Sequence, residues 1–343
     1  MKRRSISLCA ILVILLLTGS LSTGFTAARE SEEAIPPVNI DPYRLYDYEV
    51  REIWCDNNGQ KIYGEAYIPK TEGKSPLVIH SHGMGTNHNA GASYGEKYAP
   101  YGVALYCFDF RGGTNLKKRT NRSDGKTTEM SVLTEASDVT AVLNAAKTWD
   151  FVDTDRIYLE GGSQGGLVTA IAGIQHEDEI AGLILHYPAF GMHDIMNDGR
   201  SIEDIPEAFD LGGLYVGRIF IEDLWRYDVR DDLPDFDKPV LMIQGSEDDL
   251  VHPEGSEAAS KCYPDCEYRL IQGAGHGFDG KYHDEASRYA LDFLYRQFGI
   301  NHTQEHQTVR WIFLTASFAL SVAAVIICAM IARKKATNNS QDH

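Results

Sequence analysis

The sequence predicts an α/β fold: a mostly parallel central sheet with helices on both faces, a small cap insertion and one C-terminal transmembrane helix. Short apolar runs alternate with stretches of helical periodicity from residue 77 to residue 298, and glycine-rich loops join them. Near the end of the chain, 22 consecutive residues carry no charge. The composition, 43% hydrophobic and 24% charged, is typical of a globular protein rather than a disordered or fibrous one.

The charge of the chain is unevenly distributed. The 343 residues have a formal net charge of −17, yet basic clusters stand at both ends, at residues 2–4 and 333–335. Between Arg29 and Arg310 there are 26 basic and 48 acidic side chains. Because binding to phosphate backbones needs a basic surface, we expect no nucleic-acid partner.

The N-terminal segment, residues 1–28, has the order of a secretory signal peptide. A basic start is followed by an apolar run at residues 11–17 and by small residues up to Ala28. The apolar run is short for a spanning helix, which favours cleavage near Ala28 over a retained anchor. Residues 29–47 contain proline and glutamate and are expected to form an extended lead-in.

The C-terminal segment is expected to anchor the protein after a linker at residues 300–310. A helix over residues 311–332 would rise ~33 Å, enough to cross the hydrocarbon core of a bilayer. Trp311 stands at one boundary and basic residues at the other, so the tail at 333–343 is predicted to be cytoplasmic. We therefore predict a single-pass protein of the cell membrane whose globular part is extracytoplasmic.

The globular domain is predicted to span residues 48–299. Residues 48–68 have the pattern of two strands around an Asn-Gly turn. The segment between residues 189 and 237 is too long for an ordinary loop, so we expect it to form the cap. The remaining elements are predicted as strands at 77–79, 103–108, 156–160, 180–187, 239–244 and 268–271, and as helices at 133–149, 167–174 and 286–298.

The sharpest motif is Gly-Gly-Ser-Gln-Gly-Gly at residues 161–166, between a predicted strand and a predicted helix. A serine on so tight a turn has a strained backbone, and the residues two positions away must lack bulk. Gly161 and Gly165 meet this need. The turn would lift the Ser163 hydroxyl above the sheet, so Ser163 is the candidate nucleophile.

A serine nucleophile needs a histidine base that is itself oriented by an acid, in the chain order serine, acid, histidine. Asp248 follows a predicted strand and is the candidate acid, with Glu247 and Asp249 as alternatives. His276 follows the last predicted strand among glycines and is the candidate base. His252 is the nearest alternative base.

The oxyanion of a tetrahedral intermediate needs two backbone N–H donors. One is expected from Gln164, directly after the nucleophile. The other is expected from Met84, in the glycine-containing loop that follows an early strand. This chemistry requires no metal and no organic cofactor.

The six cysteines show no zinc-binding spacing. Cys9 lies in the predicted signal and Cys328 in the predicted span. Cys107 is expected to be a small buried hydrophobic residue. Cys262 and Cys266 are near enough in sequence to pair outside the cell, although their spacing alone is weak evidence of a disulfide.

Over residues 48–298 the pattern resembles the α/β-hydrolase superfamily, and more narrowly the bacterial cinnamoyl or feruloyl esterases. The motifs behind this resemblance are His-Gly-Met-Gly at 82–85, Phe-Asp-Phe-Arg-Gly at 108–112, Ser-Gln-Gly-Gly at 163–166, Tyr-Pro-Ala at 187–189, and 204–206 with 211–215 in the insertion. The resemblance implies the α/β-hydrolase fold, the triad Ser163, Asp248 and His276, and the oxyanion donors Met84 and Gln164. The sequence of the cap diverges, so an aromatic substrate is not carried over.

The expected activity is hydrolysis of a small-molecule carboxylic ester. A serine peptidase of the prolyl-oligopeptidase or aminopeptidase type is the main alternative, because Glu203, Asp204 and Glu207 could offer charge to a free amino terminus. The second alternative is a surface binding protein that has kept the fold without the activity. The sequence leaves the oligomeric state open.

Overall fold

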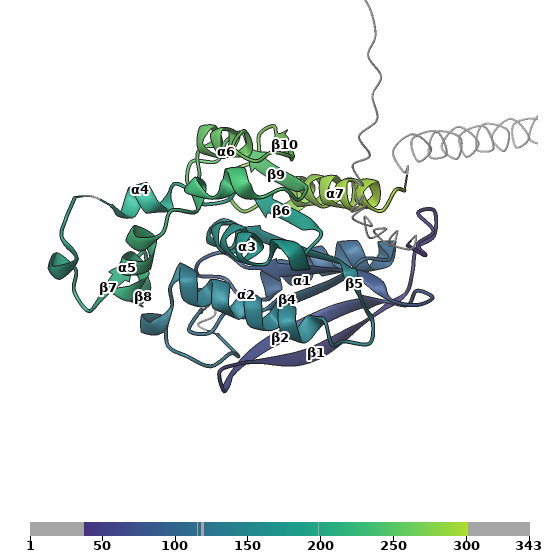
Figure 1. Cartoon of the computed structure of the whole chain (residues 1–343), viewed down its shortest axis with the longest axis horizontal. Coiled ribbons are helices and arrows are strands. Elements are labelled where there is room, and N and C mark those ends of the chain that lie inside the picture. The colour runs from purple at the N-terminus through teal and green to yellow at the C-terminus, as the bar shows by residue number, and fades with distance from the viewer. Residues whose placement is uncertain (1–37, 115, 118–119, 198, 301–343) are drawn as a thin grey trace, which may run out of the picture. The chain divides into compact units, whose positions relative to one another are not determined.

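The computed structural model describes residues 38–300 except 115, 118, 119 and 198. Its centre is an eight-stranded sheet in the order β1-β2-β4-β3-β5-β6-β9-β10 (Figure 1). The strands are β1 (Tyr48–Asn57), β2 (Gln60–Pro69), β3 (Ser75–Ser81), β4 (Ala104–Phe108), β5 (Val152–Gly162), β6 (Gly182–His186), β9 (Val240–Gly245) and β10 (Cys266–Ile271). The pairs β1–β2 and β2–β4 are antiparallel and all others are parallel, which confirms the predicted mostly parallel sheet.

Helices cover both faces of this sheet, as predicted. The helices α1 (Asn89–Tyr98) and α7 (Gly280–Gln297) pack on one face, and α2 (Val132–Ala146), α3 (Gln164–Gln175) and α6 (Pro253–Ser260) pack on the other. Alternate residues of each strand enter the two cores, as the two-residue period of a strand requires. In β3, for example, Val78 faces α1 and α7, whereas Leu77 and Ile79 face α2 and α3.

The hairpin of β1 and β2 turns at Asn58 and Gly59, which both have positive φ, as the Asn-Gly signal predicted. Helix α1 is not apparent in the sequence because it contains Gly91 and Gly95, which disfavour helix. The structure explains both glycines. A Cβ at Gly91 would lie 2.5 Å from the Cβ of Cys107, and one at Gly95 would lie 2.5 Å from the ring of Tyr67.

Two boundaries differ from the prediction, and one further helix was not predicted. Helix α7 begins at Gly280 rather than residue 286, helix α3 begins directly after Ser163, and α6 lies in a stretch for which the sequence predicted no element. The first turn of α7 contains no regular apolar spacing, so its start gives no periodic signal. Helix ends are in general less clear from sequence than the existence of a helix.

The segment between β6 and β9 forms a small cap beyond the carboxyl ends of the strands (Figure 1). It comprises α4 (Met192–Met196), the hairpin of β7 (Ala208–Leu211) and β8 (Leu214–Gly217), and α5 (Ile219–Arg226). Asp223 of α5 accepts a hydrogen bond of 2.5 Å from Ser131, the residue that caps α2. This buried contact joins the cap to the sheet domain.

The predicted terminal segments lie outside the described residues. These are the signal peptide at 1–28, residues 29–37 of the lead-in at 29–47, nearly all of the linker at 300–310, the transmembrane helix at 311–332 and the tail at 333–343. Between residues 38 and 300, none of the described helices has the combined length and apolar character needed to span a bilayer.

All four cysteines of the described part are free thiols. Cys107 is buried in β4, as predicted. Cys262 and Cys266 are not joined by a disulfide, and the Cys262 thiol instead donates a hydrogen bond to the carbonyl oxygen of Ala258 over 3.6 Å. The suggested disulfide is therefore not formed in this structure.

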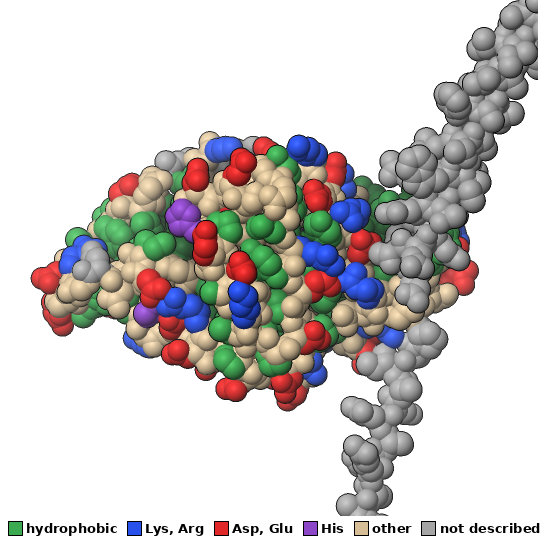
Figure 2. All heavy atoms as spheres, turned by 90° about the horizontal axis from the view of Figure 1, so that it is seen from above, with side chains coloured by type: hydrophobic (Ala, Val, Ile, Leu, Met, Phe, Trp, Pro, Cys, Tyr) green, Lys and Arg blue, Asp and Glu red, His purple; other side chains and the backbone are tan. Residues whose placement is uncertain are grey.

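The face of the molecule drawn in Figure 2 carries acidic and basic side chains that alternate, with hydrophobic side chains between them. No broad basic area gathers on the described part of this face. A mixed surface of this kind gives little long-range attraction to a polyanion.

Candidate active site

Ser163 occupies a strained turn between β5 and α3. Its φ of 57° and ψ of −124° lie in a region that residues with a side chain rarely adopt. Gly161 and Gly165 make the turn possible: a Cβ at Gly161 would lie 2.3 Å from the Gly165 carbonyl oxygen, and one at Gly165 would lie 2.2 Å from the Ser81 carbonyl oxygen. The elbow can therefore form only with glycine at both positions.

The structure brings Ser163, His276 and Asp248 into one hydrogen-bonded set. His276 Nε2 lies 3.0 Å from Ser163 Oγ, and His276 Nδ1 lies 2.9 Å and 3.1 Å from the two carboxylate oxygens of Asp248. The three residues come from the ends of three different strands, β5, β9 and β10. Within the described residues, neither of the alternative acids Glu247 and Asp249 bonds to this histidine.

Asp248 is fixed on all sides. Its side chain is fully buried, and one oxygen accepts hydrogen bonds from the backbone N–H groups of Leu250, at 3.0 Å, and Val251, at 2.8 Å. The other oxygen accepts from the Gln244 side chain at 3.1 Å. A carboxylate with so many donors is held in one orientation, and it can therefore fix the ring and tautomer of His276.

The two predicted oxyanion donors stand beside Ser163. Gln164 is the first residue of α3. Met84 lies in the loop that follows β3, and this loop passes close to Ser163: a Cβ added at Gly83 would lie 3.3 Å from Ser163 Cβ. Within the described part, neither Gln164 N–H nor Met84 N–H donates to another group. Both donors are therefore available to a ligand at Ser163.

His82 shapes the loop that carries Met84. Its Nδ1 donates to the Gly83 carbonyl oxygen at 2.9 Å, and its Nε2 accepts from the Phe110 N–H at 3.2 Å. Burial lowers the pKa of His82 to about 4, so the ring is neutral and one nitrogen can donate while the other accepts. This structural role was not apparent from the sequence.

Glu135 lies behind Gln164 and was also missed. The Gln164 side-chain amide donates to Glu135 Oε2 at 2.6 Å, and both residues are buried. Burial raises the pKa of Glu135 from its ordinary 4.5 to about 8, with the nearby Asp138 acting in the same direction and the Gln164 hydrogen bond opposing it. At neutral pH Glu135 is therefore a protonated acid hydrogen-bonded to Gln164, the residue predicted to supply an oxyanion donor.

The burial of Glu135 predicts how the stability of the fold depends on pH. Because the folded pKa is raised, protonated Glu135 stabilises the fold fully below pH ~4.5, and this contribution is lost as the pH rises through about 8. Glu135→Gln removes that dependence. Between pH 5 and pH 8, the free energy of unfolding of the wild type should fall relative to that of the variant by up to about 1.4 kcal/mol per pH unit. Urea unfolding at four pH values measures this, and parallel curves for the two proteins would contradict the assignment.

A second buried cluster lies one layer below the elbow, on the sheet face covered by α1 and α7. Glu160 Oε1 accepts hydrogen bonds from His80 Nδ1 at 3.1 Å and from His186 Nε2 at 2.9 Å. Burial alone would raise the pKa of Glu160, but the two imidazole donors outweigh it and lower the pKa to about 2. An ionised carboxylate is therefore fixed in the core beneath the active site.

Tyr187 packs against the ring of His276. It follows β6 with a positive φ of 37°, which is unusual for a bulky residue, and its N–H donates to the Ile243 carbonyl oxygen at 2.7 Å. Its ring centroid lies 4.7 Å from that of His276 and 4.7 Å from that of Phe278. The backbone strain thus places an aromatic wall against the candidate base.

Ser163 and His276 open into a cavity of about 880 Å³. A volume of this size lies within the range of small-molecule sites. Most of its lining is apolar and comes from the cap and the neighbouring loops: Met84, Leu116, Pro188, Ala189, Phe190, Met192, Ile195, Met196, Leu211, Leu250 and Val251. The alternative base His252 also lines the cavity, but the structure places His276 rather than His252 between Ser163 and Asp248.

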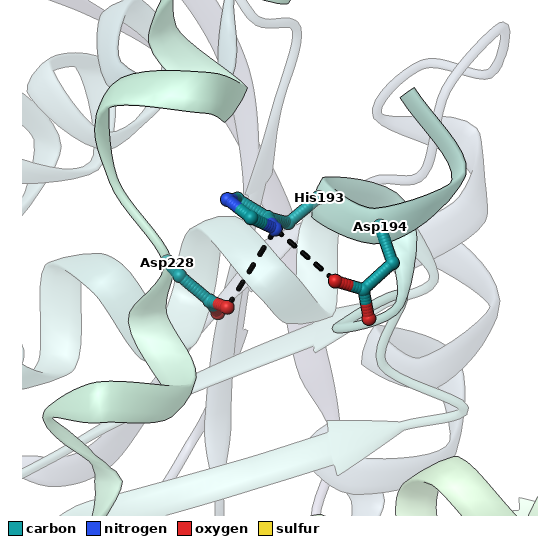
Figure 3. Close-up of side chains that lie close together, drawn as sticks. All are labelled: His193, Asp194 and Asp228. Carbon is teal, nitrogen blue, oxygen red and sulfur yellow. Dashed lines mark hydrogen bonds and ion pairs between the residues drawn. The ribbon is translucent and has the colours of Figure 1, made fainter. Parts of the chain in front are cut away.

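One group of side chains in the cap has the composition of a metal site. Nδ1 of His193 lies 3.2 Å from a carboxylate oxygen of Asp194 and 3.7 Å from one of Asp228 (Figure 3). Both carboxylates, however, are already bound by the Arg230 guanidinium at 2.6 Å. The arrangement is thus an ion-pair cluster centred on Arg230, and we assign no metal to it.

Comparison with known proteins supports the fold. The model of the prolyl oligopeptidase family matches residues 97–301, more than half of the chain. Est1E from Butyrivibrio proteoclasticus, solved with ferulic acid bound, is 29% identical with a TM-score of 0.65, and the match covers 72% of this chain and 99% of that chain. The structure of Est816, described as an N-acyl homoserine lactone degrading enzyme, has a TM-score of 0.53 at 21% identity over 70% of this chain and 100% of that one, which shows the shared fold alone.

Among curated proteins, the quorum-quenching protein AidA of Acinetobacter baumannii (strain MDR-ZJ06) is 24% identical over 139 residues. That match covers 40% of this chain and 43% of AidA, so the chain spans less than half the length of this relative. The extent of the family match, together with the parallel sheet and the serine elbow, establishes the α/β-hydrolase fold predicted from the motifs. The chain belongs to the prolyl oligopeptidase family.

Proposed function

We propose that this protein is a serine hydrolase that cleaves carboxylic esters, with Ser163 as nucleophile, His276 as base and Asp248 as the orienting acid. The observation that carries the proposal is the continuous hydrogen-bonded series from Asp248 through His276 to Ser163 at the mouth of an apolar cavity. The similarity over the whole length of Est1E, whose structure holds ferulic acid, supports an ester as the substrate.

The proposed reaction follows from the positions of these groups. His276 Nε2 takes the proton of Ser163 Oγ as the oxygen attacks the ester carbonyl carbon, and the N–H groups of Gln164 and Met84 stabilise the resulting oxyanion. The tetrahedral intermediate collapses as the carbon–oxygen bond breaks, and His276 delivers its proton to the leaving alcohol. Water, deprotonated by His276, then attacks the acyl-enzyme and releases the carboxylic acid and free Ser163.

The family name makes a peptidase the second candidate, and the cavity argues against an aminopeptidase. Glu203, Asp204 and Glu207 were the acids proposed to bind a free amino terminus, yet none of them lines the cavity. Among the described residues of the lining, Asp194 is the one carboxylate, and it is bound by Arg230 at 2.6 Å. A substrate with a free ammonium group would therefore find no unpaired carboxylate among the described residues of the lining, which favours an uncharged ester.

Parallel assays of p-nitrophenyl acetate and of aminoacyl-p-nitroanilides would separate the two candidates. We expect turnover of the ester and labelling of Ser163 by a fluorophosphonate probe. Turnover of the anilides without the ester would support the peptidase instead. A folded protein that neither hydrolyses an ester nor reacts with the probe would support the third hypothesis, a binding protein.

We also propose that the protein is exported through residues 1–28 and held in the cell membrane by residues 311–332, with the hydrolase domain outside the cell. The support is in the sequence alone: a basic, apolar and small-residue order at the start, and 22 uncharged residues followed by three basic ones near the end.

Membrane fractionation tests this location. The full chain should stay in the membrane pellet after carbonate washing, and protease added outside intact cells should reach the hydrolase domain. A matched chain that ends at residue 300 should appear in the soluble fraction of the exported proteins. A full chain that is released by carbonate would contradict the anchor, and a domain protected from protease in intact cells would contradict the orientation.

A further inference from the structure

The active-site cavity carries polar groups at one end that the proposed mechanism does not use. Ser93, Tyr94 and His283 line it there, from α1 and the beginning of α7. The part of the lining that comes from the cap is mostly apolar, with Met192 and Met196 among its residues, and its carboxylate at Asp194 is bound by Arg230. The two ends of the cavity therefore suit chemically different parts of a substrate.

The hydrogen bonds of Ser93 determine which nitrogen of His283 is free. Ser93 Oγ donates to the Ala90 carbonyl oxygen at 2.9 Å, so at its contact of 3.0 Å with His283 Nε2 the hydroxyl oxygen must accept. His283 Nε2 then carries the ring proton and Nδ1 keeps its lone pair. Among the described residues nothing donates to Nδ1, and this atom is not sealed in the interior. It is an accessible hydrogen-bond acceptor.

His283 is neutral at physiological pH. Burial lowers its pKa to about 4, and the neighbouring His186 and Lys97 act in the same direction, whereas Glu160 and Asp284 oppose them. A neutral ring keeps the Nδ1 lone pair available, whereas a protonated ring would donate at both nitrogens.

The ring of His283 is also held in place. Its centroid lies 4.2 Å from that of Tyr94, and Tyr94 is buried against His80 and His186 at centroid distances of 5.3 Å and 4.9 Å. The acceptor therefore has a defined direction without rearrangement of the site, which is what a specific contact to a ligand requires.

The chemistry of the triad decides which part of the ester reaches this end. His276 must deliver a proton to the leaving oxygen, so the alcohol of the ester lies on the His276 side of the nucleophile. Gly277 and Phe278 directly follow His276 and line the cavity together with His283, seven residues along the chain. The leaving alcohol thus points toward His283, which leaves the apolar end under the cap for the acyl group.

We propose that His283, held by Ser93 and Tyr94, is a specificity residue that accepts a hydrogen bond from a free hydroxyl group on the leaving alcohol. The preferred substrates are then apolar acyl esters of polyhydric alcohols, such as a glycerol or a sugar. This inference rests on the proposed esterase activity of Ser163 and extends it to the alcohol half of the substrate.

Two butanoate esters provide a matched test. 1-Monobutyrin and propyl butanoate share the acyl group and a three-carbon alcohol, and they differ only in two free hydroxyl groups. We expect the wild-type kcat/KM to be about fivefold to tenfold higher for 1-monobutyrin, which is the ratio that the net free energy of one neutral hydrogen bond would give. His283→Phe keeps an aromatic ring against Tyr94 but removes the acceptor, so the ratio should fall to about one.

Two further variants control this experiment. Ser93→Ala leaves the imidazole present but removes the partner that fixes its tautomer, so its ratio should fall between those of the wild type and His283→Phe. Thr140→Val breaks a similar hydroxyl–imidazole pair, Thr140 Oγ1 to His176 Nε2 at 2.8 Å, outside the cavity lining. Its ratio should equal that of the wild type.

The possible failures are distinguishable. A wild-type ratio near one, or a ratio that neither His283→Phe nor Ser93→Ala changes, would overturn the alcohol subsite and leave the esterase activity standing. If folded wild-type protein hydrolyses neither ester and does not react with a fluorophosphonate, the proposed function itself fails. Circular dichroism of each variant verifies the fold, and Ser93→Ala keeps the test valid if His283→Phe does not fold.

Discussion

Ser163→Ala is expected to lower kcat for ester hydrolysis by about 10⁶-fold, because the variant has no oxygen to attack the carbonyl carbon. The fold should be unaffected: alanine differs from serine by one oxygen, and the close approaches at Gly161 and Gly165 that allow the backbone at φ 57° do not involve that oxygen. The variant should still hydrolyse the ester about 10³–10⁴ times faster than the uncatalysed reaction in water, because the Gln164 and Met84 donors and binding in the cavity remain. The measurement is kcat for p-nitrophenyl acetate, with enzyme prepared free of wild-type carry-over.

The double variant Ser163→Ala/His276→Ala sharpens this result. Because every proposed step of His276 depends on attack by the Ser163 oxygen, which lies 3.0 Å from its Nε2, removing both side chains should cost no more than removing Ser163 alone. Asp248→Asn should cost less, about 10⁴-fold, since it leaves the base present but in the wrong tautomer. If Ser163→Ala keeps more than a hundredth of the wild-type rate, the nucleophile lies elsewhere.

The candidate site was predictable from sequence where its chemistry is local. The elbow is one six-residue segment whose glycines are sterically required, and Asp248 and His276 each follow a strand in the order that a serine triad needs. The alternation of strands and helices likewise indicated the sheet. These features depend on short windows, in which sequence and geometry are directly related.

The rest of the site depends on contacts between distant segments, which no local pattern encodes. Glu160 meets His80 across 80 residues and His186 across 26, and Glu135 meets Gln164 across 29. Each of these residues alone is indistinguishable from a surface charge or an incidental histidine. The order of strands β3, β5 and β6 in the sheet brings the first three together, and that order becomes known only with the fold.

Removing the carboxylate of Glu160 should have a large effect on stability. The side chain is fully buried, and Glu160→Leu would leave the N–H groups of His80 and His186 in the core without an acceptor. Breaking one side of a buried charged cluster costs about 3–5 kcal/mol, a large share of the stability of a typical domain. The midpoint of urea unfolding at pH 7 should fall accordingly, and a Leu variant with the wild-type midpoint would contradict the role of this cluster.

Glu160→Gln separates the charge from the geometry. The amide oxygen can still accept from His80 and His186, so the loss at pH 7 should be smaller than for leucine. Because the folded pKa of Glu160 is lowered to about 2 from an ordinary 4.5, the ionised carboxylate stabilises the fold fully above pH 4.5, and this contribution is lost as the pH falls toward 2. The Gln variant lacks this carboxylate, so its free energy of unfolding should fall less steeply than that of the wild type between pH 5 and pH 3. Equal slopes would show that Glu160 is not ionised in the core, and the hydrogen bonds alone would then have to account for the cluster.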